Sequence, residues 1–518
     1  MEKVVVVDFG SQYAHLIARR IRELRVYSEI IPYSAAKDVL DGEGIRGIVL
    51  SGGPRSVCEE GSPKIDRDFL ESALSRGIPI LGICYGHQLL AYVMGGRVER
   101  GPRGEYGISK LEVLEEDEIF RGLPRVQEVW MSHRDLVVEL PDGFEVLAST
   151  ECCAIAAYKC ESAPMYGVQF HPEVVHTRYG KEILRNFLYS ICGCSGNWVV
   201  EDLALRKMEE IRERAGEGNV LMAASGGVDS TTAAYLIGKA LGFDRIHLVV
   251  IDTGLLREGE AEGAAEMLRR LGFSNVHLVD ASDLFLERLR GITDPEEKRR
   301  VIASTYVEVL MAKARELEEL YGDFRYLGQG TIYPDRIESG RAGSGSAKIK
   351  SHHNVVLSEA LGLELLEPLL DLYKDEVRRL ARSLGLPEEV IKRHPFPGPG
   401  LAIRIVGEVT REKLDVLRRV DRIVEEEMKK SGYYDKVWQA FPVLLPFKTV
   451  GVMGDERTYR YAVALRIVVS EDAMTAEFAK LPWELLEKIS SRIVNEVLEV
   501  NRVLYDLTNK PPATIEFE

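Results

Sequence analysis

The sequence is poor in cysteine, and it has neither a long hydrophobic run nor an internal repeat. Its seven cysteines are an odd number, none lies beyond residue 194, and no C-x-x-C pair occurs. This pattern excludes a disulfide framework and a cysteine-ligated zinc site, and it is typical of a reducing compartment. No apolar run is long enough to span a membrane, and no signal peptide precedes the V-V-V-V run at residues 4–7. We therefore expect a cytoplasmic protein without membrane contact.

A surplus of positive charge is also missing. The 518 residues include 82 acidic and 67 basic side chains, which gives a formal net charge of −15. Because nucleic-acid binding depends largely on the neutralisation of phosphates, this balance argues against a nucleic-acid partner. Hydrophobic residues make up 45% of the chain, so three or four domains can each bury a core.

The most informative segment is L-M-A-A-S-G-G-V-D-S at residues 221–230. Residues 220–224 predict a buried parallel strand, and residues 230–241 predict the helix that follows it. Two glycines between them let backbone N–H groups approach an anion, and the helix N-terminus adds further donors. An ordinary glycine turn is the alternative, but the full pattern favours a phosphate site. We predict ATP-binding residues Ser225, Gly226, Gly227, Val228, Asp229, Ser230 and Thr231.

This loop lacks the lysine and the spacing of the G-x-x-x-x-G-K-[ST] phosphate loop. The S-G-G-x-D-S pattern instead resembles the pyrophosphate loop of the N-type ATP pyrophosphatases. These enzymes cleave ATP between the α- and β-phosphates and transfer AMP to a substrate oxygen. Asp229 is the acid nearest the phosphates and could hold Mg²⁺, although it equally fits an acidic residue in a first helical turn.

The first third of the chain alternates strands with helices. Residues 4–8, 45–50 and 78–83 predict buried strands, and together they indicate an α/β domain with a mainly parallel sheet. The third strand ends in G-I-C-Y-G-H-Q at residues 82–88, with glycines two positions before and after Cys84. This spacing predicts a nucleophile elbow, and the helix N-terminus favours a thiolate. The alternative is a buried structural cysteine.

A cysteine nucleophile needs a base. The segment Q-F-H-P-E supplies His171, with Glu173 two residues later to orient its imidazole. His133 in M-S-H-R-D is a competing base, and spacing alone does not decide between the two. The elbow and F-H-P-E together resemble the triad-type glutamine amidotransferases. This resemblance implies that Cys84 attacks the amide of glutamine, with His171 as base and Glu173 as its partner.

The same resemblance assigns the surroundings of the cysteine. It implies that S-G-G-P at residues 51–54 holds the tetrahedral oxyanion through the N–H groups of Gly52 and Gly53, assisted by that of Tyr85. Gln88 matches a residue that holds the glutamine. His87 stands where close relatives usually carry methionine.

The middle third follows a break at C-G-C-S-G-N, residues 192–197. Strands at 246–252 and 327–332 end near the phosphate loop, because ligands of open α/β sheets lie beyond the carboxyl ends of strands. Residues 340–350 are rich in glycine and serine, and they predict a lid that closes Lys348 and Lys350 over the phosphates, or else a plain surface loop. The run Lys298, Arg299, Arg300 is typical of a solvated helix face.

The last third is a small α+β unit. H-P-F-P-G-P-G-L-A-I-R at residues 394–404 excludes a helix or a central strand. Residues 410–431 and 482–500 predict helices, and residues 449–454 and 459–470 predict a hairpin. The chain ends in K-P-P-A-T-I-E-F-E, which is either a stiff tail or an edge strand.

Taken in order, the motifs of the whole chain resemble the glutamine-hydrolysing GMP synthetase family. The resemblance implies three domains: a type 1 glutamine amidotransferase at 1–192, a doubly wound ATP pyrophosphatase at 193–393, and an α+β dimerisation and XMP-binding domain at 394–518. It further implies XMP contacts from Arg300, Lys510 and Glu516, a homodimer, and use of ATP with Mg²⁺. The implied reaction aminates XMP to GMP through an adenylyl-XMP intermediate, with release of AMP and pyrophosphate and with ammonia from glutamine.

Three other functions fit parts of the sequence. A tRNA-thiolating enzyme uses the same ATP loop, but it needs a cysteine in or after the ATP domain, and this chain has none after Cys194. NAD or asparagine synthesis does not fit the motifs of the last third. A catalytically dead scaffold is disfavoured by the intact Cys84, His171 and Glu173.

Overall fold

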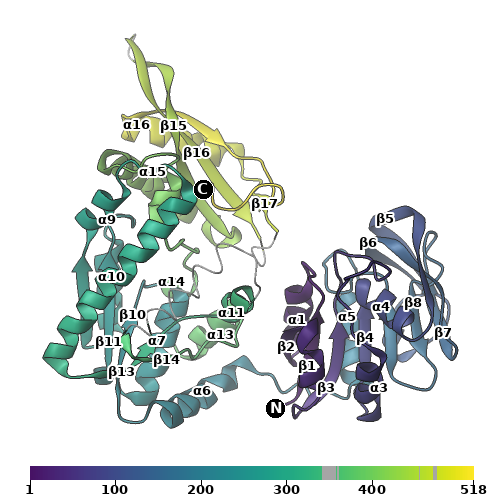
Figure 1. Cartoon of the computed structure of the whole chain (residues 1–518). Coiled ribbons are helices and arrows are strands. Elements are labelled where there is room, and N and C mark those ends of the chain that lie inside the picture. The colour runs from purple at the N-terminus through teal and green to yellow at the C-terminus, as the bar shows by residue number, and fades with distance from the viewer. Residues whose placement is uncertain (341–357, 359–360, 454–455, 471–474) are drawn as a thin grey trace. The chain divides into compact units, whose positions relative to one another are not determined.

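The computed structural model describes residues 1–340, 358, 361–453, 456–470 and 475–518. It divides into two compact units, Met1–Val199 and Val200–Glu518, which are described separately (Figure 1). Lys348 and Lys350 lie outside the described residues. Within those residues, every helix is too short or too polar to cross a bilayer.

The first unit is built on a nine-stranded sheet in the order β2-β1-β3-β4-β9-β8-β7-β5-β6. Its first five strands are parallel, and the four valines of β1 are fully buried because helices cover both faces of such a sheet. Their bounds are β1 (Lys3–Asp8), β2 (Tyr27–Pro32), β3 (Ile45–Leu50), β4 (Ile80–Ile83) and β9 (Met165–Val168).

The other four strands of this sheet are antiparallel, so the expectation of a mainly parallel sheet is wrong for half of it. In β5 and β6 buried and exposed positions largely alternate, which is the pattern of a sheet with one face in solvent. These strands lack the apolar runs that mark the parallel half. Their bounds are β5 (Arg97–Val113), β6 (Val126–Glu139), β7 (Phe144–Ser149) and β8 (Ala157–Cys160).

Helices complete the first unit, and α4 packs against β4 and β9, next to the predicted cysteine elbow. The side chains of α4 are almost all buried, since it lies between the two halves of the sheet. The helices are α1 (Ala14–Glu23), α2 (Ala36–Val39), α3 (Arg67–Ser75), α4 (Tyr85–Val93) and α5 (Gly180–Arg185).

The second unit begins with a five-stranded sheet in the order β12-β11-β10-β13-β14, and all its strand pairs are parallel, as predicted. The strands are β10 (Asn219–Ala223), β11 (Ile246–Asp252), β12 (Asn275–Asp280), β13 (Phe324–Gly328) and β14 (Glu364–Leu366). The helices of this part are α6 (Val200–Ala215), α7 (Val228–Leu241), α8 (Glu260–Arg270), α9 (Ser282–Leu289), α10 (Pro295–Tyr321), α11 (Tyr333–Gly340), α13 (Lys374–Ser383) and α14 (Glu388–Ile391).

The C-terminal part of this unit shares a core with the parallel sheet. One hydrophobic cluster runs from Leu221 and Val249 in the sheet to Leu417 and Val420 of α15 and on to Ile489 of α16. Figure 1 shows α15 beside β15 and β16. The elements are α15 (Arg411–Lys430), β15 (Gln439–Met453), β16 (Glu456–Val469), β17 (Glu477–Phe478), α16 (Trp483–Glu496) and β18 (Val500–Tyr505).

Two boundaries in this part differ from the sequence prediction. β15 begins at Gln439 rather than at 449, although Pro442 and Pro446 argue against a strand. Pro442 pairs with Leu465 and the register shifts between Leu444 and Lys448, so an irregularity in the ladder accommodates the second proline. The last helix ends at Glu496, and the residues after it form β18 beside β16.

The C-terminal tail is held by a buried arginine rather than by a long strand ladder. Arg466 in β16 is fully buried, and its guanidinium donates hydrogen bonds to the carbonyls of Thr508, Thr514 and Ile515. The Nη2–O distance to Thr514 is 2.8 Å. Backbone pairing within the tail is an isolated bridge between Lys510 and Ala476. Arg466 is therefore one of the side chains that fix the position of the tail.

Candidate active site

Cys84 occupies a strained turn between β4 and α4. Its φ angle is 54°, in the left-handed region that non-glycine residues rarely adopt. The flanking glycines are required by space: a Cβ on Gly86 would lie 2.3 Å from the carbonyl oxygen of Leu50, and one on Gly82 would lie 2.5 Å from that of Gly86. The elbow geometry therefore follows from close approach of three backbone segments.

The structure brings Cys84, His171 and Glu173 together. His171 Nδ1 lies 2.7 Å from Glu173 Oε1, and both side chains are buried. Burial alone would lower the pKa of His171, but the negative charges of Glu173 and Cys84 outweigh it and raise this pKa well above its usual value. The protonated form of His171 is therefore favoured beside Glu173 and Cys84.

The S-G-G segment reaches the same place. A Cβ on Gly52 would lie 3.5 Å from His171 Cε1 and 3.9 Å from Cys84 Cβ, so its backbone borders the thiol and the imidazole. A Cβ on Gly53 would lie 3.0 Å from the ring of Tyr85. As the first residue of α4, Tyr85 has no intrahelical acceptor for its N–H group.

His133, the competing base, is engaged elsewhere. Its Nε2 lies 3.2 Å from Glu105 Oε2, and its Nδ1 lies 3.1 Å from the carbonyl oxygen of Asp135. Gln88 donates to the same Asp135 carbonyl at 2.8 Å and to Gln169 Oε1 at 3.0 Å, so its amide belongs to a buried network. His87 is fully buried, and burial lowers its pKa to about 3, which keeps it neutral.

The ATP loop follows the predicted plan, with α7 starting two residues earlier than expected. Gly226 has a φ angle of 70°, and Ser225 Oγ accepts from the N–H of Gly227 at 3.4 Å. Ser230 Oγ lies 3.3 Å from Ser225 Oγ and donates to the carbonyl of Gly227 at 3.2 Å. Thr231 is fully buried, so its hydroxyl faces the interior rather than the open side of the loop.

Asp229 stands in the first turn of α7 and pairs with Lys374 at the start of α13. Its other oxygen, Oδ1, is buried and has no hydrogen-bond partner among the described residues. Lys374 was not predicted, because a single lysine in a charged helix start carries no signal in the sequence. A carboxylate with one unpaired oxygen beside a phosphate loop fits the oxygen ligands that Mg²⁺ prefers.

The segment after β13 also closes on the loop. A Cβ on Gly330 would lie 2.9 Å from the backbone nitrogen of Ser230 and 3.0 Å from the carbonyl carbon of Asp229. The Q-G-T-I segment therefore abuts the first turn of α7 directly. Gly330 is therefore needed for close packing, which the sequence pattern did not reveal.

The predicted XMP residues have different surroundings. Arg300 is exposed and lies 3.4 Å from Glu297. Glu516 accepts two hydrogen bonds from Arg404, at 3.0 and 3.1 Å, and a third from Gln439 at 2.7 Å. The expected solvated face is wrong for Lys298, which is fully buried, donates to the carbonyl of Ile405 at 2.8 Å and pairs with Glu518.

Glu173→Gln removes the charge that raises the pKa of His171. The folded protein then loses the imidazolium at lower pH, so we expect the alkaline limb of glutamine hydrolysis to move to lower pH. The rate should fall on the order of 10²-fold, the contribution of a positioned acid–base pair. A pH profile of glutamine hydrolysis measures both effects. Glu105→Gln, beside His133, is the control; a shift of the alkaline limb to lower pH in that variant alone would assign the base role to His133.

Gly330→Ala should displace the first turn of α7 because the new methyl group meets backbone atoms. We expect nucleotide binding to weaken roughly tenfold, which corresponds to about 1.4 kcal/mol. Gly263→Ala is the matched control, since Gly263 lies in exposed helix with open space around it. This control should stabilise the protein by about 1 kcal/mol and leave binding unchanged. Titration calorimetry with ATP distinguishes the two; equal affinities would contradict the contact.

Three family models match the chain in order. Residues 5–191 match "Glutamine amidotransferase class-I", residues 200–312 match "NAD synthase", and residues 426–517 match "GMP synthase C terminal domain". The NAD synthase match spans the phosphate loop and β11, which indicates a shared nucleotide-binding fold.

Curated relatives match over the full length. A GMP synthase [glutamine-hydrolyzing] of Symbiobacterium thermophilum is 54% identical over 99% of both chains. Its counterpart from Aquifex aeolicus is 52% identical over 99% of both. That of Carboxydothermus hydrogenoformans is 53% identical over 100% of this chain and 99% of its own.

Proposed function

We propose a function that follows from one fact: this chain belongs to the family of glutamine-hydrolysing GMP synthases. It is a ligase that aminates XMP to GMP with ATP and with glutamine as the nitrogen donor. The observation that carries this function is the presence, in one chain, of an amidotransferase elbow and a pyrophosphatase-type loop, each with its own geometry.

At the first site, Cys84 attacks the side-chain amide of glutamine and ammonia leaves. His171 activates the thiol in this proposal, and Glu173 holds its imidazole at 2.7 Å. Gly52, Gly53 and Tyr85 present N–H groups to the oxyanion. Gln88 takes part by fixing the Asp135 carbonyl and Gln169 beside the cysteine.

At the second site, the loop from Ser225 to Thr231 holds the two departing phosphates of ATP. The 2-oxygen of XMP attacks the α-phosphate, pyrophosphate leaves, and ammonia then displaces AMP from C2. Backbone N–H groups at the start of α7 and the ammonium of Lys374 favour the negative charge on the leaving group. In this proposal Lys510 and Glu516, on the tail, and Arg300, on α10, contact XMP.

Cys84→Ala should abolish GMP formation from glutamine and keep formation from ammonium salts, because the second site receives its nitrogen either way. The measurement incubates the wild type with XMP, ATP, Mg²⁺ and amide-labelled glutamine and follows the label by mass spectrometry. The label should appear in GMP, and AMP should form in equal amount. Loss of ammonia-dependent synthesis in Cys84→Ala, or release of ADP instead of AMP, would refute the two-site function.

Asp229 would hold a Mg²⁺ ion in this proposal, and its unpaired Oδ1 is the supporting observation. Magnesium supplies charge neutralisation on the phosphates when it is bound. Asp229→Asn should therefore raise the Mg²⁺ concentration needed for half-maximal AMP release by roughly tenfold or more. Lys374→Gln is the control for the ion pair alone. An unchanged Mg²⁺ dependence in Asp229→Asn would contradict a metal-binding role, and Asp229 would then be an ordinary acidic residue in the first turn of a helix.

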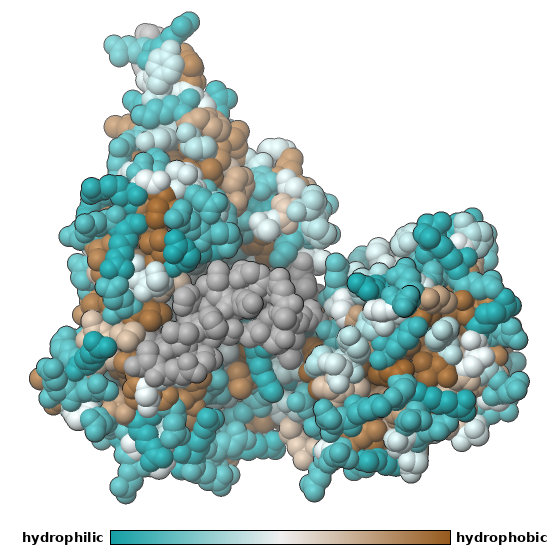
Figure 2. Space-filling model, viewed as in Figure 1, coloured by the Kyte–Doolittle hydropathy of each residue, from teal (hydrophilic) through white to brown (hydrophobic). Residues whose placement is uncertain are grey.

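The C-terminal part forms the homodimer in this proposal. Val450 and Tyr459 are paired across β15 and β16, and both are exposed; Val452 and Trp483 are 71% and 82% exposed. Figure 2 shows hydrophobic residues on this part of the surface. Val450, Val452 and Tyr459 lie on the β15–β16 hairpin and Trp483 begins α16. Exposed apolar side chains that gather on one hairpin are typical of an interface.

Val452→Lys should shift the dimer toward monomer by roughly tenfold or more in dissociation constant, because it places a charge in the apolar contact. Leu205→Lys on α6 is the matched control, since Leu205 is also 71% exposed. Sedimentation velocity measures the two variants. An identical monomer fraction in both would contradict this surface as the interface.

Three further expectations stay predictions: a cytoplasmic location, the lack of a nucleic-acid partner, and the domain limits at 192/193 and 393/394. Charge and cysteine usage support the first two. Cell fractionation and the absorbance ratio of the purified protein test them. Limited proteolysis between residues 192 and 200 tests the first boundary.

A further inference from the structure

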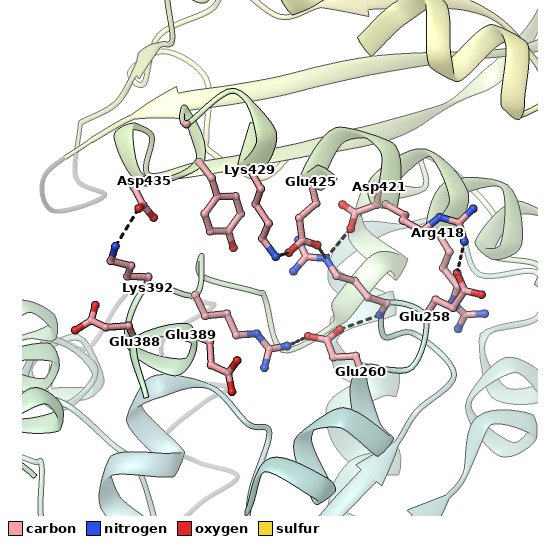
Figure 3. A pocket seen from close by; sticks show the side chains of 15 residues that line it. Glu258, Glu260, Glu388, Glu389, Lys392, Arg418, Asp421, Glu425, Lys429 and Asp435 are labelled. Atoms are coloured by element: carbon pink, nitrogen blue, oxygen red, sulfur yellow. Dashed lines mark hydrogen bonds and ion pairs between the residues drawn. The ribbon is translucent and has the colours of Figure 1, made fainter. Parts of the chain in front are cut away.

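A line of charged side chains connects the phosphate loop to the C-terminal tail. It runs through the second unit and borders a cavity of about 700 Å³ between the start of α8 and α15. Figure 3 shows Glu260 on one wall of this cavity and Asp421 on the opposite wall. Most residues that line the cavity are charged, with both signs present.

The line starts at Gly226 of the phosphate loop. Arg393 Nη1 donates to the carbonyl oxygen of Gly226 at 3.0 Å, and the same guanidinium pairs with Glu260. Glu260 Oε2 accepts from the backbone N–H of Arg257 at 2.8 Å. The turn that presents N–H groups to the phosphates is therefore tied to the loop after β11.

The line continues to the tail. Arg257 Nε donates to Asp421 Oδ2 at 2.6 Å, and Asp421 Oδ1 lies 3.9 Å from Arg404 Nη1. Arg404 in turn holds Glu516 with two hydrogen bonds. Phe396 lies against both arginines, with its ring centre 4.9 Å from Arg257 Cζ and 5.1 Å from Arg404 Cζ.

Asp421 is the member of this line with two possible arrangements. It is 2% exposed and is shared unequally, with a hydrogen bond to Arg257 and a gap to Arg404. Arg404 is fully buried, and its Nη1 lacks a hydrogen-bond partner among the described residues. A small movement of Glu516 would let Arg404 reach Asp421, and Asp421 would then loosen Arg257. XMP bound at Glu516 would prevent this exchange and so keep Arg257 in place. Buried charges respond strongly to such exchanges because an unpaired buried charge is costly.

We propose that Asp421, Arg257 and Arg393 are positioning residues that couple the nucleotide-binding tail to the phosphate loop, so that XMP tightens the binding of ATP. This inference rests on the proposed function, since it takes the tail as the XMP site. None of the three residues takes part in bond making. They act on the carbonyl of Gly226, and through it on the N–H groups that face the departing phosphates.

The test measures ATP affinity in the full-length enzyme with and without saturating XMP. The probe is an ATP analogue with a methylene group between the α- and β-phosphates, which binds without being cleaved. In the wild type XMP should lower its dissociation constant by roughly tenfold, within the usual range of coupling between sites. In Asp421→Asn the ratio should fall close to one, while XMP and the analogue still bind singly.

Glu258→Gln is the matched control. Glu258 pairs with Arg422 at 3.1 Å and so joins the same loop to the same helix, but it stands outside the line to Gly226. Its variant should keep the wild-type ratio. Arg393→Lys retains the charge and loses the forked contact, so its ratio of dissociation constants should be intermediate. It also tests the line independently if Asp421→Asn fails to fold.

Two outcomes would overturn the proposal: a wild-type ratio of one, or a ratio in Asp421→Asn and Arg393→Lys that equals that of Glu258→Gln. Failure of the function itself is recognised separately. Wild-type enzyme given XMP, ATP and ammonium salts would then make no GMP. If GMP forms and the ratios of dissociation constants are equal in all variants, the proposed coupling is wrong and the proposed function stands.

Discussion

Both candidate sites depend on one constraint: a buried parallel strand must turn sharply into a helix, with one residue between β4 and α4 and four between β10 and α7. Cys84 adopts a φ angle of 54° in the first turn despite its side chain, and Gly226 adopts 70° in the second. In each case the sharp turn aims the first N–H groups of a helix at one point, where a thiolate or a phosphate gains from them. Glycines nearby let neighbouring backbone approach, as Gly86 does with Leu50 and Gly330 with Ser230. The chemistry proposed for the two sites differs, but both use the same sharp turn from a strand into a helix.

The charge of the chain is distributed unevenly between surface and interior. The sum is −15, yet Lys298, Arg404 and Arg466 are fully buried, and each contacts a part of the chain near the C-terminus. Carbonyl and carboxylate oxygens satisfy them, which makes their burial tolerable. The formal net charge therefore says little about individual sites, because cations inside the protein can differ in number and setting from those on its surface.

The sequence was sufficient where local chemistry and spacing coincide. The elbow, the phosphate loop and the parallel sheet of the second unit could be predicted because apolar runs, glycines and polar ends fall in a fixed order along the chain. The antiparallel strands β5 and β6 were missed because alternating side chains in a half-exposed sheet resemble loop sequence. β15 was placed too late because Pro442 and Pro446 normally exclude a strand, and only the irregular ladder to β16 accommodates them.

The site was less predictable than the fold wherever partners come from distant segments. Lys374 lies 145 positions from Asp229, and Arg393 lies 167 positions from Gly226, so no window of sequence shows either contact. The choice between His133 and His171 also needed geometry, since Glu105 and Glu173 give both imidazoles a carboxylate. Lys298 was misjudged because three adjacent cations suggest solvent, whereas burial depends on the oxygens that the fold brings near.

The hydrogen bonds from Arg466 to the carbonyls of Thr508, Thr514 and Ile515 have a genetic consequence. In the proposed function the tail binds XMP, and the position of the tail depends in part on the sheet that carries this arginine. A selection for mutants that need added purine nucleotide to grow should therefore yield two kinds of substitution. Some should fall on interior hydrophobic residues around β16, and others on residues that touch the nucleotide. Such alleles would have the phenotype of binding defects, although the substituted residues would only support the tail.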